Sequence, residues 1–187
     1  MSRSPVVVSV VRPDTRAEFE RLWLLGQVES GASGDAAARY AADGRLTSAL
    51  LRPEVHVLVA RRDRKAVGYA ILTDQSLGLV QSPDLAIDQI FVPREERRRG
   101  IARHLLAAAV VLAERSGIER VVSNVPAANR EANRFYARLG FAPATTRRVT
   151  STSSLRRRAL GGADVSPFES VLRRRRVIRT VRPTRSA

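Results

Sequence analysis

The chain has 187 residues and a formal net charge of +15, and it contains no cysteine. This length fits one domain with an extension, and a hydrophobic content of 44% excludes wholesale disorder. The lack of cysteine excludes disulfides, thiolate metal ligands and a cysteine nucleophile. No apolar run approaches the roughly 20 residues of a membrane span, and the run after Pro5 is too short for a signal peptide, so we expect a cytoplasmic protein.

The positive charge is concentrated in the last quarter of the chain. Residues 141–187 hold twelve arginines against Asp164 and Glu169, whereas the first 140 residues carry 21 positive and 16 negative charges. The main body therefore has an ordinary charge balance. A partner attracted by basicity would contact the C-terminal region.

Strands and helices are predicted to alternate along the chain. β-branched runs and alternating apolar residues predict strands, and apolar residues at helical spacing predict helices. A capping box at Thr15–Glu18 is expected to start the first helix. The expected strands lie at 6–11, 55–60, 66–73, 85–92 and around 121–122. The expected helices lie after Thr15, at 35–51 with a break near Asp43, from Ile101 until Gly117 closes the helix, and at 129–139. This order indicates a layered α/β domain.

An arginine-rich turn, Arg97-Arg-Arg-Gly100-Ile-Ala102, precedes one of these helices. Backbone N–H groups at a helix start have no intrahelical partner, and the helix dipole favours negative charge there. Gly100 lets the backbone approach a ligand, and the arginines add charge-assisted bonds to phosphate oxygens. The turn therefore predicts a pyrophosphate site. On this turn alone, a basic surface turn before an amphipathic helix is the open alternative.

A second motif lies further along the chain, Asn129-Arg-Glu-Ala-Asn-Arg-Phe135-Tyr136-Ala-Arg-Leu-Gly140-Phe141. With Ile90-Phe91-Val92-Pro93 and the arginine-rich turn, it resembles the GNAT superfamily of acyl-CoA-dependent N-acetyltransferases. The family's two patterns, Gln/Arg-x-x-Gly-x-Gly/Ala and Asn-x-x-Ala-x-x-Phe-Tyr-x-x-x-Gly-Phe, are both met without gaps. The resemblance covers roughly residues 6–150.

The resemblance implies a mixed, mostly antiparallel sheet of about six or seven strands flanked by helices. Residues 1–160 would form this domain, with its last strands from Thr145–Leu155, and residues 161–187 would be an Arg-rich extension. It also implies that acetyl-CoA is the co-substrate. The backbone of Phe91 and Val92 would pair with the pantetheine arm, and the Asn129 side chain would bind the pantetheine region. The turn would hold the pyrophosphate with backbone amides and arginine side chains; its residues are Arg97, Arg98, Arg99, Gly100, Ile101, Ala102 and Arg103.

The resemblance gives Tyr136 the role of the acid that protonates the leaving thiolate. A phenol pKa of roughly 10 is close enough to that of a thiol, near 8.5, for this transfer. A core aromatic is the alternative.

Asp88 lies where the family often places an acid, and strand alternation puts it on one face with Ile90 and Val92. We expect it to act as the general base, directly or through water; a substrate-binding anion or a solvated position is the alternative. Gln89 is a weaker candidate for orienting substrate.

The remaining polar residues carry less specific signals. His56, on an alternating strand, is expected to be structural, and His104 would at most contact the cofactor. Neither has partners at metal-ligand spacing, so no metal is expected. Asn124 follows the fifth strand and would cap it or bind the cofactor.

Two classes of function remain open from the sequence. The first is an enzyme that moves an acetyl group from acetyl-CoA to a small-molecule or protein amine by direct attack. The second is a non-catalytic acetyl-CoA-sensing or nucleic-acid-binding protein; Tyr136 favours the enzyme, because a binding module needs no acid at the sulfur. In the tail, Phe168, Val171 and Leu172 would dock on the domain or on a second subunit, giving a homodimer. Arg173–Arg176 would bind an anionic partner: nucleic acid (RNA or DNA), an anionic membrane surface or an acidic protein. A solvated tail is the third interpretation.

Overall fold

The computed structural model describes residues 4–75, 83–145 and 148–159. The chain divides into two compact units, Met1–Phe141 and Ala142–Ala187. In the first unit the helices are α1 (Arg16–Glu29), α2 (Gly34–Ala42), α3 (Arg45–Leu50), α4 (Ile101–Arg115) and α5 (Arg130–Ala137), with 3-10 turns at Pro13–Thr15 and Arg94–Glu96. Its strands are β1 (Val7–Val10), β2 (Val55–Arg62), β3 (Lys65–Gln75), β4 (Asp84–Phe91) and β5 (Val121–Ser123). The described part of the second unit contains α6 (Thr152–Ala159).

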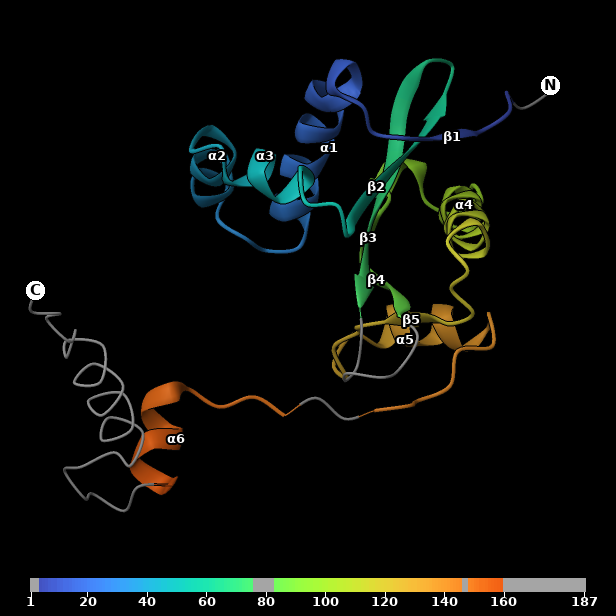
Figure 1. Cartoon of the computed structure of the whole chain (residues 1–187). Coiled ribbons are helices and arrows are strands. Elements are labelled where there is room, and N and C mark those ends of the chain that lie inside the picture. Colours follow the sequence, from blue (N-terminus) through green and yellow to red (C-terminus); the bar gives the residue numbers. More distant parts are fainter. Residues whose placement is uncertain (1–3, 76–82, 146–147, 160–187) are drawn as a thin grey trace, which may run out of the picture. The chain divides into compact units, whose positions relative to one another are not determined.

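The strands form one sheet in the order β1-β2-β3-β4-β5 (Figure 1). The first three pairings are antiparallel, and β4 and β5 are parallel because α4 connects them. The prediction of a mixed, mostly antiparallel sheet flanked by helices is confirmed. No helix of the described chain is long and apolar enough to cross a membrane.

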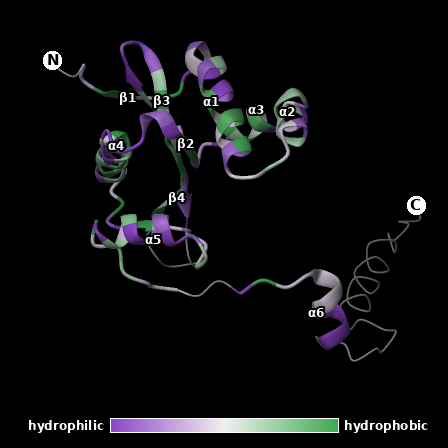
Figure 2. Cartoon of the chain, turned by 180° about the vertical axis from the view of Figure 1, so that it is seen from behind, coloured by the Kyte–Doolittle hydropathy of each residue, from purple (hydrophilic) through white to green (hydrophobic). Residues whose placement is uncertain are grey.

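Helices cover both faces of the sheet. One buried cluster joins α4 to the sheet through Ile101, Leu105 and Leu72, and Tyr136 of α5 belongs to it. The other joins α1–α3 to the opposite face through Phe19, Trp23 and Tyr69. In α6, by contrast, no residue is buried, and Figure 2 colours this helix white to purple, without a hydrophobic stripe.

A glycine lets the start of α4 lie close to the sheet. A Cβ on Gly68 would be 2.9 Å from Ile101 Cγ2 and 3.0 Å from the Phe91 carbonyl oxygen. Real Cβ atoms do not come this close to other atoms, so only glycine allows this packing. The close approach sets the position of the arginine-rich turn above the end of β4.

Two sequence predictions about elements are wrong. The Thr15 hydroxyl accepts a hydrogen bond from the Arg12 N–H instead of capping α1, and Glu18 binds Arg61 of β2 instead of closing a capping box. Residues 152–155, predicted as strand, begin α6, because Ser151 caps the helix by accepting from the Ser154 N–H. The described chain therefore forms five strands, fewer than the six or seven expected. The tail residues from 160 onward lie outside the described residues.

Candidate functional site

The sheet opens between β4 and β5. The two strands pair only through Leu85–Ile87 and Val121–Ser123. Beyond Ile87, three of the next four residues of β4, Gln89, Ile90 and Phe91, pair with β3 on one side, and none of the four pairs with a described strand on the other. Their backbone N–H and C=O groups on that side are available to an extended, amide-containing ligand, which would bind as an added strand does.

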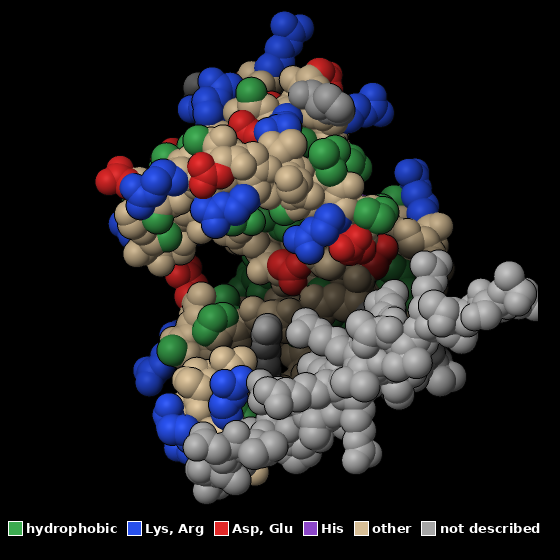
Figure 3. Space-filling model, turned by 60° about the vertical axis from the view of Figure 1, so that its left-hand side comes forward, with side chains coloured by type: hydrophobic (Ala, Val, Ile, Leu, Met, Phe, Trp, Pro, Cys, Tyr) green, Lys and Arg blue, Asp and Glu red, His purple; other side chains and the backbone are tan. Residues whose placement is uncertain are grey.

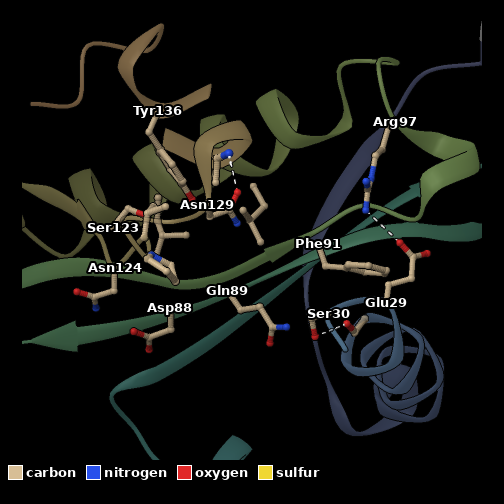
Figure 4. A pocket seen from close by; sticks show the side chains of 16 residues that line it. Glu29, Ser30, Asp88, Gln89, Phe91, Arg97, Ser123, Asn124, Asn129 and Tyr136 are labelled. Carbon is tan, nitrogen blue, oxygen red and sulfur yellow. Dashed lines mark hydrogen bonds and ion pairs between the residues drawn. The ribbon is translucent and has the colours of Figure 1, made fainter. Parts of the chain in front are cut away.

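A bulge in β4 changes which side chains face this opening. Gln89 lies opposite Ile71 and Ile87 lies opposite Leu72, so Asp88 has no partner in the register. Side chains on either side of a bulge lose strict alternation. Ile87 and Ile90 consequently both pack with the α4 cluster, and Asp88 and Gln89 leave the strand toward the same side (Figure 4).

The predicted alternation, with Asp88 on the face of Ile90 and Val92, is therefore wrong. Alternation along one strand cannot reveal a bulge that is defined by the register with β3. Asp88 is exposed, and its Oδ2 accepts a hydrogen bond from the Thr73 hydroxyl of β3.

The arginine-rich turn leads directly into α4, as predicted. Gly100 is the N-cap of this helix with a φ of +80°, and Arg98 also has a positive φ, +60°. Within the described chain, none of the five consecutive backbone N–H groups of residues 98–102 donates a hydrogen bond to a protein atom. Unpartnered N–H groups at the positive end of a helix dipole form an anion site, which fits a pyrophosphate.

The arginine side chains of the turn are not all directed to this anion site. The Arg97 guanidinium donates through Nη2 to Glu29 at 3.0 Å and through Nε to the Val92 carbonyl at 3.1 Å. Arg99 pairs with Glu96 at 3.2 Å. Arg97 therefore ties the turn to the end of α1, and its support of a pyrophosphate stays a prediction. The exposed side chains of Arg98 and Arg103 form no hydrogen bond to the rest of the described chain.

Tyr136 enters the site from α5. The residue is 6% exposed, and its ring packs edge-on against Phe135 and Phe141 at centroid distances of 5.3 and 5.0 Å. Burial raises the pKa of its phenol above the ordinary value of 10, and the neighbouring Ser123 hydroxyl partly opposes this rise. The phenol is consequently protonated throughout the neutral pH range and can donate a proton or a hydrogen bond.

Asn129 has a structural task at the start of α5. Its Oδ1 accepts a hydrogen bond from the Ala132 N–H at 3.1 Å and thereby caps the helix. The side-chain Nδ2 donates to no atom of the described chain, so this NH2 group is the part of Asn129 that remains for the predicted pantetheine contact.

These elements enclose one pocket of about 340 Å³. It brings together seven candidates from the sequence: Asp88, Gln89, Phe91, Arg97, Asn124, Asn129 and Tyr136 (Figure 4). Other lining residues come from β4, the end of β5 and the segment after it: Ile87, Ile90, Ser123, Val125 and Pro126. In the space-filling view, basic and acidic side chains are interspersed over the upper part of the face shown (Figure 3).

The end of α1 forms a wall of the pocket that was not predicted from the sequence. Gly26, Glu29 and Ser30 line the pocket at the end of this helix. Glu29 is 15% exposed and accepts from Arg97, 68 residues away, so no local pattern could have revealed the contact. A glycine within a predicted helix was the one available signal, because such a glycine often has a packing or functional reason.

The two histidines lie apart from the pocket wall. His56 contacts Asp74 at 3.3 Å on the neighbouring strand, and His104 Nδ1 lies 3.0 Å from the Gly100 carbonyl oxygen. His104 thus contacts the backbone of the arginine-rich turn. Among the residues that the structure describes, no group of three His, Asp or Glu is placed to hold a metal ion.

The chain matches a known protein family in sequence and several solved structures in fold. The family model described as "Acetyltransferase (GNAT) family" matches residues 17–141. The fold is similar to that of the ribosomal-protein-alanine N-acetyltransferase from Brucella melitensis biovar Abortus 2308, with a TM-score of 0.64 and 20% identity over 79% of this chain and 99% of that one. It is also similar to the aminoglycoside N-acetyltransferase AAC(6')-Iy in complex with CoA, with a TM-score of 0.65 and 23% identity over 81% and 97% of the two chains. The fold is also similar to that of a transcriptional regulator from Bacillus halodurans C-125, with a TM-score of 0.61 and 17% identity over 79% of this chain and 99% of that one. No curated protein matches the chain by sequence.

Proposed function

We propose that this chain, which belongs to the GNAT family of acetyltransferases, moves the acetyl group of acetyl-CoA to a primary amine. In this reaction the amine attacks the thioester directly. The chain is an acetyl-CoA-dependent N-acetyltransferase; the acceptor and the roles of single residues are our proposal. One observation carries it: the protonated Tyr136 phenol and the unpaired edge of β4 meet in the same pocket.

The residues present fit acetyl-CoA. The row of N–H groups in residues 98–102 suits a pyrophosphate, and the opening after Ile87 suits the amide groups of the pantetheine arm. Phe91, at the end of β4, would pair with that arm through its backbone. Arg98 and Arg103 would add charge beside the phosphates. The acetyl thioester supplies the acyl group and the thiolate leaving group.

Tyr136 would act as the general acid. When the amine nitrogen bonds to the acetyl carbon, the bond from that carbon to sulfur breaks and the thiolate takes the phenolic proton of Tyr136. Burial raises the pKa of this phenol, so the proton is in place before each turnover at neutral pH. Acid catalysis of this kind contributes about 10²–10⁴-fold.

Asp88 would take the proton that the amine must lose. Amines with a pKa near 10.4 are mostly protonated and unreactive at neutral pH. Asp88 lies in the pocket wall on the side of β4 shared with Gln89, and the Thr73 hydroxyl holds its carboxylate by a hydrogen bond. Because the carboxylate is exposed, a water molecule can relay the proton. Binding the ammonium group of the acceptor is the second role that this carboxylate could have.

The experiment is an initial-rate screen with acetyl-CoA and a panel of primary amines: an aminoglycoside, a peptide with N-terminal alanine, a lysine peptide and an alkyl diamine. Release of CoA is measured, and the acetylated product is identified by mass. Turnover with one amine class supports the proposal and identifies the acceptor. Tight acetyl-CoA binding without turnover of any amine would instead favour an acetyl-CoA-sensing protein on the same fold.

The basic tail is a separate proposal. Arg156, Arg157 and Arg158 extend the positive charge into α6, where all three are exposed. Exposed arginines in such density favour an anionic partner such as nucleic acid, whose binding falls with salt. This interaction, a homodimer and a cytoplasmic location stay predictions.

A further inference from the structure

Tyr69 of β3 carries a hydroxyl that the packing of the core does not require. The residue is 0% exposed, and its ring packs against Phe19 and Phe91 at centroid distances of 5.3 and 5.5 Å. Its Oη forms no aligned hydrogen bond with any atom of the described chain. A buried hydroxyl without a partner destabilises a fold, so phenylalanine would be the more stabilising residue at this position.

Gly26 provides the space for this hydroxyl. A Cβ at Gly26 would be 2.6 Å from Tyr69 Oη and 3.2 Å from Phe91 Cγ. Gly26 lies inside α1, where glycine is less favourable than almost any other residue. Two destabilising features, a glycine inside a helix and a buried hydroxyl, therefore lie next to each other beside the pocket. Such departures from stabilising residues occur most often where function requires them.

Gln89 connects this point with the pocket. In the register of β3 and β4, Tyr69 lies opposite Phe91 and Ile71 lies opposite Gln89. Tyr69 and Gln89 are thus diagonal neighbours, a distance that long side chains span. The Gln89 carboxamide is near enough to lower the pKa of the phenol and so to oppose part of the rise caused by burial. Gln89 itself lines the pocket, on the side of β4 that Asp88 shares (Figure 4).

We propose that Tyr69 is a positioning residue for the acceptor amine: its hydroxyl, admitted by Gly26, hydrogen-bonds to the NH2 end of Gln89 and holds the Gln89 carbonyl oxygen toward the pocket. There the oxygen accepts a hydrogen bond from the amino group of the acceptor. A free carboxamide can present either end, whereas a fixed one selects N–H donors. The inference rests on the proposed function, since it requires an amine in this pocket.

The first test is Tyr69→Phe, which keeps the ring and removes the hydroxyl. With the fastest acceptor of the amine panel, we expect kcat/KM for the amine to fall roughly threefold to tenfold, the range of one hydrogen bond between neutral groups. The dissociation constant of acetyl-CoA and the cooperativity of unfolding should not change, and the melting temperature should stay equal or rise. Tyr40→Phe is the matched control, because Tyr40 packs against Trp23 of the α1 layer and does not line the pocket.

The second test separates positioning from structure. Gln89→Leu should lower kcat/KM for the amine at least as much as Tyr69→Phe, and adding Tyr69→Phe to it should have no further effect. The proposal would be overturned if Tyr69→Phe lowered kcat/KM for the amine by the same factor in the wild type and in Gln89→Leu. It would also be overturned if Tyr69→Phe alone kept the wild-type kcat/KM. Gly26→Ala should disturb amine turnover in the wild type and be tolerated better beside Tyr69→Phe, where the clashing oxygen is absent.

A readout without an acceptor distinguishes a failure of this inference from a failure of the proposed function. In a 15N-labelled protein, the side-chain NH2 signals of Gln89 are assigned by their loss in Gln89→Leu. We expect two well-separated signals in the wild type that move toward the values of a free carboxamide in Tyr69→Phe. Unchanged signals would refute the positioning role even if an acceptor is found. Failure of every amine to react, with the signals moving as expected, would refute the proposed function and leave only the contact between Tyr69 and Gln89.

Discussion

Substitution of Gly100 tests the anion site at the start of α4. A Cβ at this position would meet nothing closer than the His104 ring, 3.9 Å away, so a side chain has room and the protein should fold. The φ of +80° costs a residue other than glycine about 1–2 kcal/mol. In Gly100→Glu, the added carboxylate would also face the bound pyrophosphate.

The electrostatic effect can be bounded from Coulomb's law. Two unit charges about 5 Å apart repel by about 1 kcal/mol in water and by about 3 kcal/mol at an effective dielectric constant of 20. A pyrophosphate presents two such charges, so acetyl-CoA affinity should fall about tenfold or more, since each 1.4 kcal/mol is a factor of ten.

Calorimetric titration with acetyl-CoA measures this loss. Gly100→Ala carries the backbone strain without the charge, and Gly100→Lys carries the strain with the opposite charge. We expect Gly100→Lys to bind acetyl-CoA at least as tightly as Gly100→Ala. Gly100→Ala should in turn bind it much more tightly than Gly100→Glu. A folded Gly100→Glu protein that binds as well as Gly100→Ala would refute a pyrophosphate on this turn.

The remaining predictions concern catalysis, pH and the tail. Tyr136→Phe should lower kcat by about 10²–10⁴-fold with little change in the acetyl-CoA dissociation constant, as measured by initial rates and calorimetry. Burial raises the pKa of both Tyr69 and Tyr136 above the unfolded-state value near 10, so ionisation of these phenols leaves folding unaffected below about pH 10 and increasingly favours the unfolded chain as pH rises toward the folded-state values. Each should then remove about 1.4 kcal/mol of unfolding free energy per pH unit, and urea titrations of Tyr69→Phe should show a shallower alkaline slope. Asp88→Asn should lower kcat/KM for the amine most strongly near neutral pH, and a loss confined to KM would assign the carboxylate to ammonium binding. Replacing Arg173–Arg176 with glutamine should weaken RNA or DNA binding and reduce its salt dependence while leaving acetyl transfer unchanged; equal binding would place the contact elsewhere.

The local parts of the site could be predicted from the sequence. Gly100 before an amphipathic run predicted the start of α4, and Asn129 before Ala132 predicted the start of α5, because caps and helix periods involve residues only a few positions apart. Gly117, with a φ of +67°, ends α4 as expected.

The non-local parts could not be predicted in this way. The bulge at Asp88 is defined by the register with Leu72 and Ile71 of another strand. The pair of Glu29 and Arg97 joins residues 68 positions apart. The strands expected from Thr145–Leu155 rested on residue preference, and preference for strand is easily overridden by a local cap such as that of Ser151.

The bulge also explains how one strand can serve both reactants. Without it, Asp88 would alternate with Gln89 and only one of them could face α1. With it, both polar side chains lie toward the α1 wall, while Ile87 and Ile90 remain packed in the cluster that contains Tyr136. An acceptor entering beside α1 would then meet its base and its hydrogen-bond partner on one side of β4, and the thiolate would leave toward Tyr136 on the other. Direct attack requires this separation, because the amine and the leaving sulfur lie on different sides of the acetyl carbon.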